Sequence, residues 1–312
     1  MPENVTIETI YSAEVVDALL TRAATTNQLV EGGHIHIEPN ISSKLAMPRF
    51  RIGEVLQKVI EQPTDEDAQG NFSADERYLE PEEFMAFTTF NPKVYAKWWR
   101  QYQPKGNLVF LELPTNVQNT MLGELAKTVK FELGKHFLTG VKGDGKTELF
   151  NGIIYRCLND DDRVEIENPV ALTKANIFDK MGLILKSVPE EIKEHPDLKF
   201  FMSNADFENK YDTALTELTT KGVDVTEMAK KQFKGRKIVT LSGWPENLII
   251  CTISNMDVES NWWAGIGLSS DQDAILIDKL TNAGERYFFK MKMKADTQVM
   301  WGDYNIIYDG RN

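Results

Sequence analysis

The sequence contains only two cysteines, Cys157 and Cys251, among 312 residues. Both stand in apolar stretches, IIYRCL and LIICTI, so we expect two buried free thiols and no disulfide framework. The first residues, MPENVTIETI, carry neither the basic nor the apolar region of a secretory signal, so we expect none. The longest apolar runs are about six residues, whereas a membrane-spanning helix needs about 20. These absences predict a soluble protein made in a reducing cytoplasm.

Positive charge is also scarce, with 35 Lys and Arg against 47 Asp and Glu and a formal net charge of −12. A protein that binds duplex nucleic acid needs concentrated Lys and Arg, so this balance argues against nucleic-acid recognition as the main task. It leaves room for a local basic face. The hydrophobic fraction of 42% and the charged fraction of 26% are ordinary for a folded protein, and the length suits one large or two ordinary domains.

No catalytic constellation is visible, because the Ser and Cys residues lack a nucleophile signature. His34 and His36 share one side of a possible strand at a spacing that suits metal ligands, but no third and fourth ligand stands near them. Asp160, Asp161 and Asp162 lack the spacing of an EF-hand and predict a solvated acidic turn. We therefore expect no catalytic, cofactor-binding or metal-binding residues.

Residues 140–147, GVKGDGKT, satisfy the phosphate-binding pattern G-x-x-x-x-G-K-[ST]. In a P-loop, backbone N–H groups cradle phosphate and the Lys reaches the outer phosphates, which requires a buried strand before the loop and a helix after it. Here an amphipathic helix precedes the loop, and no apolar strand ending in Asp follows at a suitable distance. A nucleotide-binding loop and a flexible turn between two structural units are the two interpretations.

Extended elements dominate the two ends of the chain. Apolar and basic side chains alternate from Tyr287 to Lys294, which predicts one long half-buried strand. Residues 45–91 predict a long hairpin, with an outgoing strand at 47–61, a polar tip at 62–77 and a return strand at 78–90. Such a hairpin has little core of its own and is marginal when isolated, so we expect it to lean on a neighbour.

Helical patterns fill the middle of the chain. Residues 115–138 predict a helix of about 34 Å with a capping box at its start, an apolar residue every fourth position and a stop at Gly140. Shorter amphipathic helices are predicted around Trp98 and Trp99, and after Ser12. Residues 150–278 predict an α+β module, with a helix capped by Thr173, a strand at 198–203, a helix capped by Asn204, and strands at 237–241 and 248–253.

In this order the segments resemble the major capsid protein of tailed bacteriophages, the Hong Kong 97-type fold. The resemblance rests on PTNVQNTMLGELAKTVKFELGKHFLTG, LFNGIIYRCL, LTKANIFDKMGLILKSVP, LKFFMSNADFENKY, FKGRKIVTLSGWPENLIICT and ERYFFKMKMKADTQVMWGDYNIIY. It implies an α+β fold and, within the axial domain, a helix, a strand, a second helix and paired strands. The implied parts are an N-terminal arm at 1–44, an extended β-hairpin called the E-loop at 45–91, a peripheral domain at 92–149 and 279–312 with the spine helix at 115–138, and an axial domain at 150–278.

The resemblance implies a structural protein rather than an enzyme. Copies would assemble into pentamers and hexamers of an icosahedral head, contact packaged double-stranded DNA non-specifically, and meet scaffolding and portal proteins but no membrane. The shell would be assembled in the bacterial host cytoplasm and remain in the virion. An encapsulin-type nanocompartment shell is the alternative with the same fold, although the long arm and the lack of an N-terminal cargo-docking helix favour the phage. A P-loop NTPase is the alternative from another class.

Overall fold

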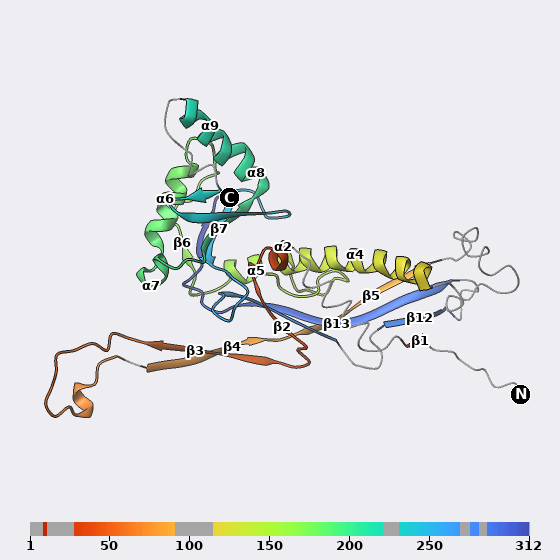
Figure 1. Cartoon of the computed structure of the whole chain (residues 1–312), viewed down its shortest axis with the longest axis horizontal. Coiled ribbons are helices and arrows are strands. Elements are labelled where there is room, and N and C mark those ends of the chain that lie inside the picture. Colours follow the sequence, from red (N-terminus) through yellow and green to blue (C-terminus); the bar gives the residue numbers. More distant parts are fainter. Residues whose placement is uncertain are drawn as a thin grey trace, which may run out of the picture.

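The strands of the described residues form two six-stranded β-sheets and a separate two-stranded hairpin (Figure 1). The computed structural model describes residues 9–10, 28–70, 72–90, 115–220, 231–268, 275–280 and 286–311. The helices predicted after Ser12 and around Trp98 lie outside these residues. Within them, no helix combines the length and the hydropathy that a membrane span requires.

The first sheet is built around β13 (Tyr287–Val299), the longest strand of the described chain. Along one edge, β5 (Glu82–Phe90) pairs antiparallel with residues 287–295 of β13. Along the other edge, β12 (Ile275–Lys279) and then β11 (Trp262–Leu268) follow one another. The sheet is completed by β1 (Thr9–Ile10) beside β12 and by β2 (His36–Pro39), which runs parallel to β11.

The predicted alternation along β13 is confirmed. Phe289, Met291 and Met293 are buried, and the lysines between them are only half-buried. The apolar face of the sheet is covered by α4 (Thr115–Thr139), which Figure 1 shows running along β13. Leu133 and Phe137 of this helix join Ala295 and Val299 of β13 in one buried cluster. The predicted helix is confirmed, and its 25 residues correspond to about 37 Å.

The second sheet has the strand order β6-β14-β10-β7-β9-β8. Its two central strands, β10 (Leu248–Ile253) and β7 (Leu198–Ser203), are buried along their whole length. The others are β6 (Val164–Glu165), β14 (Ile306–Asp309), β9 (Arg236–Leu241) and β8 (Gln232–Phe233). Helices pack against this sheet around a second buried cluster: α6 (Ile177–Ser187), α7 (Glu190–Lys193), α8 (Asn204–Asp206), the π-helical η4 (Phe207–Asp212) and α9 (Thr213–Thr220).

Three details of this half differ from the prediction. The first helix begins at Ile177, with Asn176 rather than Thr173 at its N-cap. The helix after β7 is capped by Ser203 rather than Asn204, because the Ser203 hydroxyl accepts a hydrogen bond from the Asp206 N–H at 2.9 Å. The strands at 236–241 and 248–253 do not pair with each other, because β7 lies between them and runs parallel to β9. Their connection carries Trp244 into the core, where its indole N–H donates to the Leu248 carbonyl at 2.8 Å, so it does not form a hairpin turn.

Strand pairing also crosses the predicted domain limits. β11 and all but the last residue of β12 lie within residues 150–278 but pair with β13, whereas β14 lies within residues 279–312 but pairs with β10. Each sheet therefore takes strands from both predicted ranges. The predicted limits differ from the sheet membership because they follow the order of the sequence. β13 and β14 are joined by a short turn and yet belong to different sheets.

Candidate assembly surface

The hairpin differs from its predicted limits on both sides, because the outgoing strand predicted at 47–61 ends at Ile52. β3 (Leu45–Ile52) pairs with β4 (Phe72–Leu79), from Leu45 opposite Leu79 to Ile52 opposite Phe72. The predicted return strand at 78–90 is wrong over most of its length, because residues 82–90 form β5 in the sheet of β13. Residues 72–77 of β4, FSADER, lie in the predicted tip instead, because they are exposed and lack the apolar alternation of a half-buried strand.

The outer part of the hairpin extends away from the two sheets (Figure 1). It includes one short turn, η1 (Asp65–Asp67), in which the Asp67 carboxylate accepts hydrogen bonds from the Thr64 backbone N–H and hydroxyl at 2.9 and 2.8 Å. Large apolar side chains remain exposed along this part: Phe50, Ile52, Val55, Leu56, Val59, Ile60 and Phe72. Large exposed apolar patches usually mark contact surfaces, so these seven exposed side chains give the outer hairpin the character of one.

The root of the hairpin is held by a buried ion pair between Arg77 of β4 and Asp160. Arg77 Nη2 lies 3.0 Å from Asp160 Oδ1, Nη1 bonds the other carboxylate oxygen, and Nη1 also donates to the Val299 carbonyl at 3.1 Å. Burial raises the pKa of Asp160, but the hydrogen bonds and charge of Arg77 outweigh burial and hold that pKa below its usual value. The predicted solvated acidic turn is therefore wrong for Asp160, which is 8% exposed, and right for Asp161 and Asp162.

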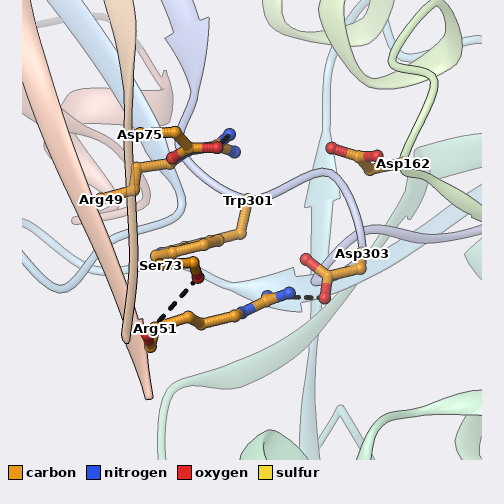
Figure 2. A pocket seen from close by; sticks show the side chains of 7 residues that line it. All are labelled: Arg49, Arg51, Ser73, Asp75, Asp162, Trp301 and Asp303. Atoms are coloured by element: carbon orange, nitrogen blue, oxygen red, sulfur yellow. Dashed lines mark hydrogen bonds and ion pairs between the residues drawn. The ribbon is translucent and has the colours of Figure 1, made fainter. Parts of the chain in front are cut away.

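A second contact at the root involves two arginines of β3 and the turn between β13 and β14. Arg49 and Arg51 have their guanidinium carbons 4.9 and 4.4 Å from the centre of the Trp301 ring, and Figure 2 shows the ring between the two side chains. Arg49 also donates to the Met300 carbonyl at 2.9 Å, and Arg51 forms an ion pair with Asp303 at 2.6 Å. These contacts are ordinary cation–π and ion-pair interactions at a partly exposed site.

Sequence reasoning did not identify this contact. The one local signal is the Arg-Phe-Arg order at 49–51, because residues two apart in a strand lie on the same face. A small apolar cluster adds to the attachment, with Met47 and Leu79 of the hairpin buried against Ile41 and Trp263. The inner end of the hairpin is therefore fixed to the body by both polar and apolar contacts, whereas its outer end is exposed.

The GVKGDGKT segment does not have the surroundings of a P-loop. It follows helix α4 rather than a strand, and the next helix, α5, begins only at Ile153. Two of the backbone N–H groups that would face phosphate are used within the turn: Gly143 N–H donates to the Glu148 carbonyl at 3.2 Å, and Gly145 N–H donates to the Glu148 carboxylate at 3.0 Å. This geometry supports the interpretation as a turn between two structural units.

His34 and His36, whose spacing suits metal ligands, have different environments. His34 is buried, and burial together with the positive charges of Lys199 and Lys237 lowers its pKa to about 4. His36 Nδ1 lies 2.7 Å from the Met256 carbonyl oxygen. Within the described ranges, no group of three His, Cys, Asp or Glu side chains is arranged to hold a metal ion. The predicted burial of Cys157 and Cys251 is confirmed, and burial raises the pKa of both thiols.

Neither protein-family models nor curated proteins match this chain, but solved structures do. A chain of the satellite phage P4 procapsid that includes the size determination (Sid) protein is 14% identical, with a TM-score of 0.60 over 99% of this chain and 93% of that chain. A chain in the capsid of Myoviridae phage XM1 is 11% identical, with a TM-score of 0.56 over 90% and 91%. A chain in the cyanophage A-1(L) capsid is 11% identical, with a TM-score of 0.52 over 99% and 96%.

At these identities the likeness establishes the fold. The chain has a mixed α+β fold of the Hong Kong 97 type, as the resemblance in sequence implied.

Proposed function

We propose that this chain is the structural subunit of an icosahedral phage head, in which copies form pentamers and hexamers around double-stranded DNA. It acts by assembly rather than by catalysis. The observation that carries the proposal is the hairpin, whose root is fixed to the body while its outer apolar side chains are exposed. The compared chains come from phage capsids and a procapsid, which supports a shell subunit of this fold.

The size of the exposed surface explains why association is favourable. Fully burying one large aliphatic or aromatic side chain contributes about 1.5–3 kcal/mol, so the seven on the outer hairpin offer roughly 10–20 kcal/mol before the costs of association. Obligate contacts commonly bury more than about 2,000 Å², and an extended hairpin can add to such a contact by lying across a neighbouring copy without disturbing either core. Assembly in the host cytoplasm, scaffolding and portal partners, and a non-specific contact with DNA belong to the same proposal.

A deletion in the hairpin tests the proposal directly. Removing residues 54–70 joins Gly53 to Asn71 and leaves a two-residue Gly-Asn loop between the paired Ile52 and Phe72. Glycine in the first position suits the type II′ turn of such hairpins. We expect a far-ultraviolet circular dichroism spectrum close to that of the wild type, because the sheets are untouched, and failure of shell formation in sedimentation and negative-stain images.

Matched point variants separate the hairpin from apolar surface in general. Leu56→Ser with Val59→Ser removes two exposed side chains from the hairpin, whereas Val141→Ser with Val170→Ser removes two exposed side chains elsewhere. We expect only the first pair to impair assembly. Closed shells built by the deletion variant, or a wild-type chain that stays monomeric at every concentration and salt, would refute the proposal.

A further inference from the structure

His34 lies where the two six-stranded sheets meet. It follows α2 (Gln28–Glu31) and precedes β2, which belongs to the sheet of β13. Its ring packs edge-on against Phe201 of β7, in the other sheet, with the two ring centroids 5.5 Å apart. The Phe201 ring in turn lies 4.4 Å from that of Trp262 in β11, so the imidazole is part of the packing that joins the sheets.

Backbone contacts hold the turn that carries this ring. The His34 N–H donates to the Leu29 carbonyl at 2.8 Å, and the His34 carbonyl accepts a hydrogen bond from the Ser254 hydroxyl at 2.6 Å. Gly32 leaves room for the ring, since a Cβ there would lie 2.6 Å from His34 Nε2. Because the side chain is buried, it reaches water only when the turn at residues 32–34 separates from β7.

The surroundings of the ring suit a neutral imidazole and oppose a charged one. In the described part of the chain, the buried His34 Nδ1 has no hydrogen-bond partner. Lys199 of β7 and Lys237 of β9 add positive charge, while Asp197 is held by Lys199 at 3.3 Å. Burial is the larger cause and the two lysines the smaller, and together they lower the pKa of His34 from its ordinary 6.5 to about 4.

We propose that His34 makes the junction between the two sheets sensitive to acid. Protonation of its ring favours release of the turn at residues 32–34 from β7, because the imidazolium then regains water and moves away from two like charges. Near neutral pH the ring is uncharged and the turn stays packed. The switch lies within one subunit, so it does not depend on the proposed shell.

The released turn binds a proton more readily than the packed turn, and this difference sets the size of the effect. An exposed histidine has a pKa of about 6.5, whereas the pKa of His34 in the packed turn is about 4. The equilibrium constant for release should therefore rise as the pH falls from about 6.5 to about 4, by roughly twentyfold between pH 7 and pH 5.

Hydrogen exchange in the full-length chain measures this release at the amides of Gly33 and residue 34, which donate to the Val30 and Leu29 carbonyls. After correction for the intrinsic pH dependence of exchange, their protection should fall roughly twentyfold from pH 7 to pH 5. His34→Gln, which is neutral at every pH, should abolish most of this fall, whereas the matched control His36→Gln should retain it. A wild-type chain without the fall, or a His34→Gln variant that keeps it, would overturn the proposal.

A pair of lysine variants tests the cause without changing the histidine. Lys237 and Lys234 are both exposed, and Lys237 is the one whose charge acts on His34. Lys237→Met removes a like charge and should raise the pKa of His34 toward its ordinary value, so the total fall in protection from pH 7 to pH 4 should be smaller than in Lys234→Met. This comparison decides the matter even if His34→Gln does not fold, and equal falls in the two lysine variants would contradict the proposed switch.

Discussion

Replacing Arg77 by methionine tests whether one buried ion pair fixes the root of the hairpin. The Arg77 side chain is 18% exposed and that of its partner Asp160 is 4% exposed, so methionine preserves the packing of the stem but leaves a buried carboxylate without its cation. Removing one partner of a buried pair typically costs about 3–5 kcal/mol, most of it from the orphaned charge.

Arg51 offers a matched control on the same hairpin. Its side chain is 42% exposed and that of its partner Asp303 is 32% exposed, so water screens their interaction. An exposed ion pair contributes about 0.2–1 kcal/mol, and the cation–π contact with Trp301 adds about 0.5–1 kcal/mol. Arg51→Met should therefore cost about 1–2 kcal/mol, clearly less than Arg77→Met.

Hydrogen exchange at the paired amides of β3 and β4 measures this difference locally. Because about 1.4 kcal/mol corresponds to tenfold in an equilibrium constant, Arg77→Met should accelerate exchange by roughly a hundredfold or more, and Arg51→Met by roughly thirtyfold at most. Adding Asp160→Asn to Arg77→Met should recover part of the protection, since it removes the orphaned charge. If Arg51→Met loosens the hairpin as much as Arg77→Met does, the buried pair is not the main attachment.

Three further results are expected. The pKa of Asp160 is lower in the folded protein than in the unfolded chain, so its ion pair contributes fully to stability above the unfolded pKa of about 3.9. This contribution is lost as the pH falls through the lower folded pKa. Protection of the hairpin amides from hydrogen exchange should therefore be constant between about pH 7 and 5 and fall only below about pH 4. Gly267→Ala should lower the melting temperature, because its Cβ would lie 2.1 Å from the Ile41 carbonyl oxygen, whereas Gly123→Ala, with open space around it, should be neutral or stabilising. Lys146→Ala should leave assembly unchanged, and titration calorimetry should detect no ATP binding to the wild type or to the variant. Micromolar ATP binding by the wild type that is lost in the variant would contradict the interpretation of GVKGDGKT as a turn.

Elements whose burial follows a local repeat were predictable from the sequence. The alternation from Tyr287 to Lys294 identifies β13, the four-residue apolar spacing identifies α4, and the continuous apolar run LKFFMS identifies β7. In each case one face, or the whole strand, is buried in the same chain. The repeat therefore appears in consecutive residues and can be recognised without knowing the partner.

The hairpin shows where this approach fails. β4 is largely exposed on both faces, so FSADERYL carries no burial pattern, and its pairing with β3 depends on residues twenty or more positions away. The Arg77–Asp160 pair and the contact of Arg49 and Arg51 with Trp301 likewise join distant segments. A run of charges is the same in sequence whether its members are solvated or paired, so Asp160 was not distinguishable from its neighbours Asp161 and Asp162.

The sequence alone therefore determined the type and limits of most buried elements, the burial of both cysteines, and an order of segments that resembles one capsid fold. These follow from local periodicity, which reflects how each segment meets a core of its own chain. Only the tertiary structure decided that β7 separates β9 from β10, that β5 pairs with β13 rather than with the hairpin, and that Arg77 forms an ion pair with Asp160. Strand order and ion pairing depend on the relative free energies of alternative long-range contacts. Each of these contacts joins two distant segments, so no short stretch of sequence contains both partners.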